Sequence, residues 1–81
     1  MFLVYILKSL ITARYYIGHT SDLNKRLKAH NFGNVKSTKG YKPWEVIYTE
    51  KFETKSEAFK REMQLKSYKS GQALNRIIGN K

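Results

Sequence analysis

The 81-residue chain contains no cysteine and only six acidic residues. Without cysteine there is no disulfide framework, no thiolate nucleophile, no zinc ribbon and no iron–sulfur cluster. Small secreted domains usually depend on such cross-links, so we expect a reducing, cytoplasmic location. The apolar run of residues 2–7 is too short to span a bilayer, and it lacks the flanks of a signal peptide. We therefore expect no membrane partner.

Acidic residues are scarce beside 16 lysines and arginines, which gives a net charge of +10. Such a charge favours a polyanionic partner: nucleic acid, an anionic membrane surface or an acidic protein. Two-metal centres need several clustered carboxylates, whereas the one aspartate and five glutamates of this chain are scattered, which favours one ion. A Gly-rich phosphate loop, a Ser-His-Asp set and zinc-ligand spacing are also missing.

The residues that are present suffice for one small domain, residues 1–81, because 41% of them are apolar. The continuous apolar residues 2–7 predict a central strand that is covered on both faces. Residues 14–18 predict a second strand. About six residues connect the two strands, so they should pair antiparallel.

The remaining elements follow from caps and alternation. A cap at Thr20 or Ser21 predicts a helix to about residue 31. Residues 44–52 predict a third strand, with Trp44, Val46 and Tyr48 on one face. Residues 54–57 match a capping box that starts a helix reaching about residue 69, and residues 72–79 predict a short final helix. The expected fold is α+β, a three-stranded antiparallel sheet flanked by helices in the order β-β-α-β-α-α.

Glu62 falls within the apolar stripe of the helix predicted after residue 54, close to Ala58 and Leu65 on a helical wheel. A carboxylate there is costly unless a cation or hydrogen bonds satisfy it. Two interpretations are open. Glu62 is either a metal-binding or catalytic carboxylate, or a glutamate at the stripe edge that pairs with a neighbour such as Lys66.

Arg26 and His30 lie four residues apart on one face of the first helix, beside Leu23 and Leu27. An arginine and a histidine in this arrangement can contact a phosphate and exchange a proton. The sequence alone favours the alternative, a solvated arginine and a surface histidine near the helix end.

Tyr5, Tyr15 and Tyr16 fall in the two paired strands, and Tyr15 and Tyr16 point to opposite faces, so at most one of them shares a face with Tyr5. Tyrosine on a sheet is usually a core residue. As a proton acceptor it would need nearby positive charge to lower its pKa of about 10. Without further information the structural interpretation is favoured.

Lysines recur every third residue in the polar loop of residues 33–43, at Lys36, Lys39 and Lys42. Such a segment can bind a phosphate backbone without reading bases, although a solvated loop explains the pattern equally well. Lys25 on the first helix is a further candidate for contact with nucleic acid.

In combination these residues resemble the GIY-YIG nuclease superfamily. Val4-Tyr5-Ile6 and Tyr16-Ile17-Gly18 stand where the paired motif that names the family is expected, with Val4 in place of the first glycine. The likeness continues through the helix that carries Arg26 and His30 to Glu62, and it covers about residues 2–70. It is nearest to small stand-alone bacterial members, which are similar to the incision domain of bacterial excision repair. This similarity suggests a link to DNA repair.

The resemblance implies a divalent-metal-dependent phosphodiesterase acting on DNA. It gives Tyr5, with Tyr16, a part in deprotonating the attacking water, Arg26 a hold on the scissile phosphate, and His30 a part in proton transfer. Glu62 would be the single protein ligand of one Mg²⁺ or Mn²⁺ ion.

Two further positions are assigned by the resemblance alone. His19, where other members often have lysine, would support the tyrosines. Asn75 is the candidate for an asparagine that the family often places beyond the second helix.

The function expected is therefore an endonuclease with weak or structure-based specificity, because a core this small has no separate DNA-reading domain. The alternatives are a non-catalytic nucleic-acid-binding module of the same fold and a basic protein-interaction domain. The sequence leaves open whether a targeting protein or a homodimer completes the activity.

Overall fold

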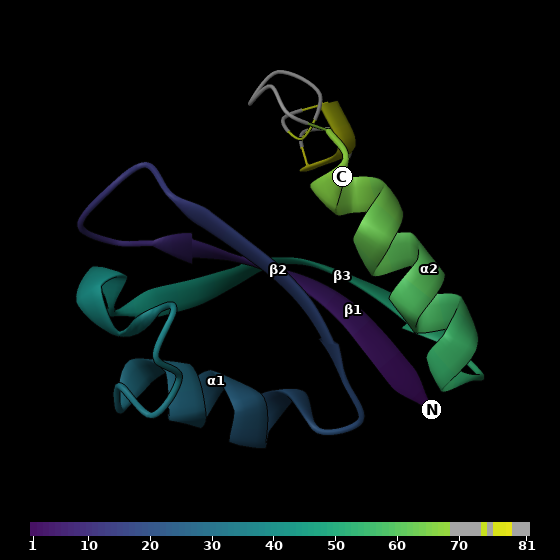
Figure 1. Cartoon of the computed structure of the whole chain (residues 1–81), viewed down its shortest axis with the longest axis horizontal. Helices are drawn as coiled ribbons and strands as arrows, with labels where there is room; N and C mark the ends of the chain where they lie inside the picture. The colour runs from purple at the N-terminus through teal and green to yellow at the C-terminus, as the bar shows by residue number, and fades with distance from the viewer. Residues whose placement is uncertain (69–73, 75, 79–81) are drawn as a thin grey trace.

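Figure 1 shows the computed structural model, which describes residues 1–68, 74 and 76–78. A three-stranded sheet contains β1 (Phe2–Ser9), β2 (Tyr15–Thr20) and β3 (Trp44–Phe52), and every pairing is antiparallel in the order β2-β1-β3. The helices are α1 (Leu23–Asn31) and α2 (Lys55–Lys66), and a short 3₁₀ helix, η1 (Lys39–Tyr41), precedes β3.

The predicted α+β class and the element order are confirmed as far as α2. The final helix predicted at residues 72–79 lies largely outside the described residues, although residue 74 and residues 76–78 have helical conformation. Asn75 also lies outside them. In the part of the chain that is described, no helix has the length and apolar character needed to cross a membrane.

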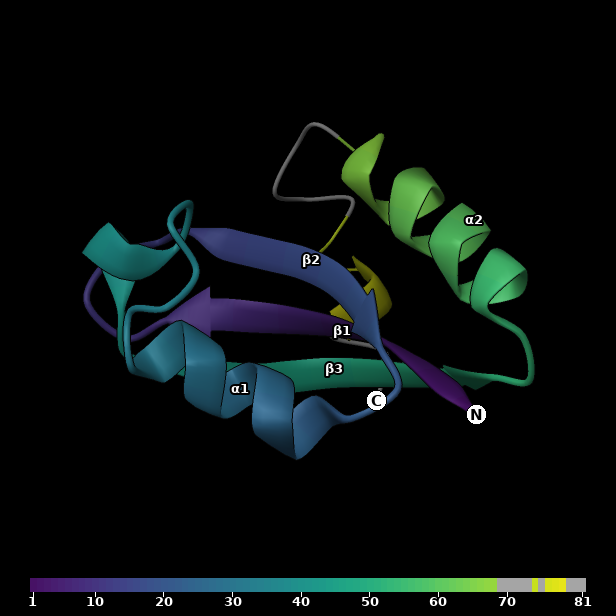
Figure 2. The ribbon, with the colours of Figure 1, turned by 60° about the horizontal axis from the view of Figure 1, so that its bottom comes forward.

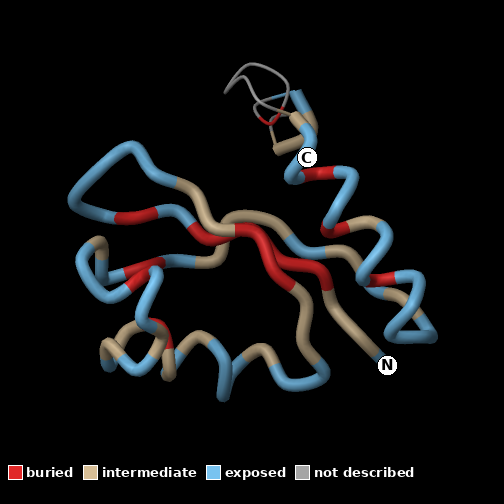
Figure 3. The backbone as a smooth tube through the Cα atoms, viewed as in Figure 1, coloured by how far each residue is buried: buried red, intermediate tan, exposed pale blue. Residues whose placement is uncertain are grey.

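β1 is the centre of the molecule because its continuous apolar sequence supplies both faces of the sheet. Val4 and Ile6 pack with α2, whereas Tyr5 and Leu7 pack with residues on the α1 side, and all four are at most 1% exposed. Figure 3 shows this buried track along the central strand, and Figure 2 shows α1 and α2 on different sides of the sheet. The expectation of a central strand covered on both faces is confirmed.

β3 has the predicted bounds but not the predicted alternation. Ile6 pairs with Tyr48 while Leu7 pairs with Val46, so Ile47 is an extra residue in a β-bulge. Tyr48 packs with Ile47 against the core on the α2 side. The prediction that Tyr48 shares a face with Val46 is therefore wrong, since a simple alternation of two cannot register an inserted residue.

The helix ends show which side chains complete the backbone hydrogen bonding. The N-cap of α1 is Asp22, whose carboxylate accepts from the Lys25 N–H at 3.1 Å, and neither Thr20 nor Ser21 fills that position as predicted. Thr54 begins α2 with the predicted capping box. This helix ends at residue 66, one turn earlier than predicted.

Candidate active site

The site begins with a glycine in the edge strand β2. Gly18 lies opposite Tyr5 of β1, and a Cβ at Gly18 would stand 2.6 Å from the Tyr5 hydroxyl oxygen. Only glycine leaves room for that side chain to cross β2. The Tyr16 ring lies beside it, with 6.2 Å between the ring centroids, so Tyr16 and not Tyr15 is the second tyrosine of this face.

Arg26 lies on α1 next to this tyrosine pair, and hydrogen bonding to Tyr5 is the largest of the effects that raise the pKa of Arg26. Burial raises the pKa of Tyr5 and outweighs the opposing effect of Arg26. The charge of Glu62 also raises the pKa of Tyr5. The Tyr5 phenol is therefore protonated near neutral pH.

His30 completes the tyrosine cluster from the last turn of α1. It is fully buried, its Nε2 lies 3.3 Å from the Tyr5 hydroxyl, and its ring centroid lies 4.7 Å from that of Tyr16. Burial, followed by the charge of Arg26, lowers the pKa of His30, so the imidazole is neutral near pH 7. The interpretation as a surface histidine is wrong.

Glu62 lies on the α2 side of the same edge strand and is 7% exposed. Its Oε1 accepts from His19 Nδ1 at 2.5 Å and its Oε2 accepts from Lys66 Nζ at 2.6 Å. Burial acts to raise the pKa of Glu62, but the hydrogen bonds from Lys66 and His19 prevail and hold it below its ordinary value. The carboxylate is thus buried in its helix stripe and paired with Lys66, as the second interpretation predicts, and a metal-binding or catalytic role stays a prediction.

The structure places His19 on Glu62 rather than on the tyrosines. His19 pairs with Val4, whose side chain faces α2, and its ring lies edge-on to Phe59 of that helix at 6.0 Å. Gly18 and His19 are neighbours in β2, so the strand separates the Tyr5 group on one face from the Glu62 group on the other.

A surface hollow of about 300 Å³ is lined by Arg26, which lies next to Tyr5, and by His19, which contacts Glu62. Its lining residues come from the start of β1, the end of β2, and the first turns of both helices: Phe2, His19, Thr20, Ser21, Arg26 and Lys55. A phosphate in this hollow would lie beside both Arg26 and the imidazole that holds Glu62. The position therefore suits an anionic substrate.

The donor set near the hollow fits a hydrated ion and not a protein cage. No group of three or more His, Cys, Asp or Glu residues that could hold a metal occurs among residues 1–68, 74 and 76–78. Mg²⁺ keeps several waters and needs only one or two carboxylates together with substrate oxygens. Glu62 could hold such an ion if Lys66, whose side chain is 45% exposed, moved away from its Oε2.

The lysines predicted to bind nucleic acid fall into two places. Lys25 lines a second hollow with Arg26, next to the site. Lys36, Lys39 and Lys42 are exposed in the loop between α1 and β3, and this loop reaches the site through Thr38, whose hydroxyl contacts His30 Nδ1 at 2.8 Å.

Sequence reasoning named no role for Thr38 or Gly18. A glycine inside a strand is a signal of close backbone or side-chain approach, so Gly18 was detectable. Thr38 carried no such signal, because only the folded loop brings it to His30.

Comparison with known proteins identifies the family to which this chain belongs. The family model described as the GIY-YIG catalytic domain matches residues 1–75. UPF0213 proteins from Staphylococcus aureus strains Mu3 and N315 are each 44% identical to this chain over 66 residues, which covers 80% of this chain and 79% of each relative. The solution NMR structure of a UPF0213 protein from Bacillus halodurans has 31% sequence identity and a TM-score of 0.63, and the match covers 100% of this chain and 86% of that one. The chain therefore belongs to the GIY-YIG family, a superfamily of nucleases.

Proposed function

We propose that this protein is a divalent-metal-dependent endonuclease that hydrolyses DNA phosphodiester bonds with weak or structure-based specificity. The observation that carries the proposal is the assembly around β2. Arg26 and His30 both lie next to Tyr5 on one face of Gly18, and the buried carboxylate of Glu62 lies on the other. A surface hollow is lined by Arg26 together with His19, the partner of Glu62.

Each group has a chemical task that its environment supports. Arg26 binds the scissile phosphate and stabilises the charge that develops on it, because a guanidinium donates to two phosphate oxygens at once. Tyr5 accepts a proton from the attacking water while it gives its own proton to neutral His30. This coupled transfer is needed because the raised pKa of Tyr5 keeps the phenol protonated.

Glu62 would hold one Mg²⁺ or Mn²⁺ ion, with His19 orienting the carboxylate. When bound, such an ion neutralises charge on the phosphate and on the leaving oxygen. The exposed lysines Lys25, Lys36, Lys39 and Lys42 would bind the flanking phosphates, consistent with the net charge of +10.

The second candidate is a non-catalytic nucleic-acid-binding module. One observation favours it: both oxygens of Glu62 are engaged by His19 and Lys66 in the ligand-free protein. A carboxylate that served only to join β2 to α2 would have these same partners.

Nicking of supercoiled plasmid in the presence of Mg²⁺ or Mn²⁺ separates the two candidates. Glu62→Gln should lower the nicking rate by about 100-fold or more, while DNA affinity, followed by fluorescence anisotropy, stays close to that of the wild type. Glu53→Gln is the matched control because Glu53 is exposed and lies at the start of the turn before α2. If wild type and Glu62→Gln bind DNA equally and neither cuts, the binding module is the better description.

A further inference from the structure

Thr38 is a buried hydroxyl that the proposed reaction does not yet use. It lies in the basic loop between α1 and β3, yet it is only 1% exposed. Its Oγ1 stands 2.8 Å from His30 Nδ1 and 3.3 Å from the Val35 carbonyl oxygen. Trp44 Nε1 donates to the Thr38 carbonyl at 3.1 Å, which fixes the loop at this residue.

The hydrogen-bond roles at Thr38 are limited by its single proton. A carbonyl oxygen can only accept, so the Thr38 hydroxyl satisfies both of its contacts when it donates to Val35 and accepts from His30 Nδ1–H. A neutral imidazole carries one N–H, so Nε2 then has a free lone pair.

The tyrosine side of the histidine leads to the same assignment. The guanidinium of Arg26 can only donate, so the Tyr5 oxygen accepts from it and the phenolic proton still needs an acceptor. His30 Nε2, 3.3 Å away, supplies that acceptor in the Nδ1–H tautomer. In the other tautomer two donors would face the Tyr5 oxygen and its proton would be left without this partner.

We propose that Thr38 is a positioning residue that holds His30 in the Nδ1–H tautomer and so keeps Nε2 ready to receive the proton of Tyr5. The inference rests on the proposed nuclease function and adds one residue to it. Thr38 also connects His30 to the basic loop, because it stands in the sequence between the exposed Lys36 and Lys39.

The proton and electron balance of the step is complete with water as the only co-reactant. The water oxygen forms a bond to phosphorus, its proton passes to the Tyr5 oxygen, and the Tyr5 proton passes to His30 Nε2. The bond from phosphorus to the leaving oxygen breaks with its electron pair on that oxygen, which takes a proton from solvent. The imidazolium then returns one proton to solvent.

The tautomer can be measured directly by long-range ¹H–¹⁵N correlation spectra of the histidine side chains. This measurement does not depend on nuclease activity. The wild type should show His30 protonated at Nδ1. Thr38→Val keeps the shape but removes the acceptor, and should give a mixed or Nε2–H ring. Thr38→Ser restores the hydroxyl and should restore the wild-type signal. A wild-type His30 protonated at Nε2, or an unchanged tautomer in a folded Thr38→Val, would overturn the proposal.

Kinetics give the second readout. Thr38→Val should lower kcat for plasmid nicking by about 10- to 100-fold with KM nearly unchanged, and Thr38→Ser should recover most of the rate. A Thr38→Ser protein as slow as Thr38→Val would contradict the role of the hydroxyl. If the wild type does not cut at all, the nuclease function fails, while the spectra still decide the tautomer. If Thr38→Val does not fold, the wild-type and Thr38→Ser spectra decide it.

Discussion

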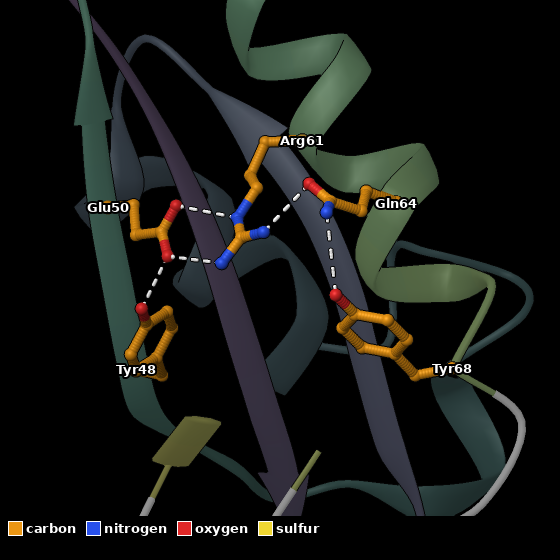
Figure 4. Close-up of polar contacts among 5 residues, drawn as sticks. All are labelled: Tyr48, Glu50, Arg61, Gln64 and Tyr68. Atoms are coloured by element: carbon orange, nitrogen blue, oxygen red, sulfur yellow. Dashed lines mark hydrogen bonds and ion pairs between the residues drawn. The ribbon is translucent and has the colours of Figure 1, made fainter. Parts of the chain in front are cut away.

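Two arginine networks flank the same sheet, and only one of them is internally complete. Figure 4 shows Arg61 extending from α2 to Glu50 on β3. Arg61 donates to Glu50 through Nε at 2.9 Å and through a second guanidinium nitrogen at 3.0 Å, and Tyr48 also donates to this carboxylate. The third guanidinium nitrogen donates to Gln64, whose amide donates to Tyr68. Within this network the charge of Arg61 is paired with that of Glu50, and each guanidinium nitrogen of Arg61 has an acceptor in the protein.

Arg26 on the opposite side of the sheet is arranged differently. The side chains that raise its pKa are those of Tyr5 and Tyr16. Among the described residues it forms no ion pair with a carboxylate, and it lines an open hollow. An arginine whose donors are all occupied by protein acceptors stabilises the fold. An arginine without a carboxylate partner can instead bind an incoming anion.

Replacing each arginine with alanine should give the largest effects. One variant should lose nicking activity and the other should lose stability. Arg26→Ala should lower the nicking rate by about 1,000-fold, because charge on the phosphate loses its main protein donor. Its free energy of unfolding should change by less than about 1 kcal/mol, because Arg26 is exposed. Plasmid nicking and urea unfolding measure the two quantities.

Arg61→Ala is the matched variant for that comparison. It removes the cation from a partly buried carboxylate and should lower the free energy of unfolding by about 1–2 kcal/mol while nicking stays within a few-fold of the wild type. The distinction between the two networks fails if both variants lose activity to the same degree or if Arg26→Ala is the less stable one.

Much of the fold was predictable because local patterns determine it. The apolar run of β1 predicted a central strand, and the capping box predicted the start of α2. The bulge at Ile47 was not predictable, because an inserted residue leaves the strand propensity unchanged and alters only the pairing with β1.

The members of the candidate site were named by the family resemblance, and their connections were not predictable. Helical spacing placed Arg26 and His30 on one face but favoured a surface histidine, and the helical wheel placed Glu62 among apolar residues without deciding its role. The partners of His19 and His30 depend on which face of β2 each neighbour occupies and on a loop without periodic structure. No spacing rule reports such contacts, so Thr38 emerged only from the folded chain.

Gly18→Ala should produce the next largest effect, because it displaces the Tyr5 hydroxyl from His30. The new Cβ would stand 2.6 Å from that oxygen. Misplacement of about 1 Å in a catalytic group lowers rates by about 100-fold, and the overpacking should cost about 1–2 kcal/mol of stability. Adding Tyr5→Phe removes the clashing oxygen and should restore part of that stability without restoring activity. Additive losses in the double variant would show that the two side chains do not meet.

Acid should weaken the Arg61 network in a defined pH window. Burial acts to raise the pKa of Glu50, but the hydrogen bonds from Arg61 and Tyr48 prevail and lower it below the ordinary value of 4.5. A carboxylate with a depressed pKa stabilises the folded state above its unfolded pKa, and this contribution disappears as the pH falls through the folded pKa. Urea unfolding between pH 6 and pH 3 should therefore show a smaller loss of stability for Glu50→Gln than for the wild type. Parallel curves would mean that Glu50 contributes nothing to the acid dependence.

The smallest effects should come from replacing single lysines. These variants distinguish the basic residue next to the site from those in the basic loop. Lys25 shares a hollow with Arg26, whereas Lys39 lies in the loop at the other end of α1. Each Lys→Ala change that removes one phosphate contact should reduce the slope of log affinity against log salt by about 1. Because Lys25 lies beside the proposed scissile phosphate, Lys25→Ala should also lower kcat by a few-fold, whereas Lys39→Ala should affect only affinity. Anisotropy titrations at three salt concentrations and single-turnover nicking measure both, and an unchanged salt slope in both variants would place the DNA elsewhere on the protein.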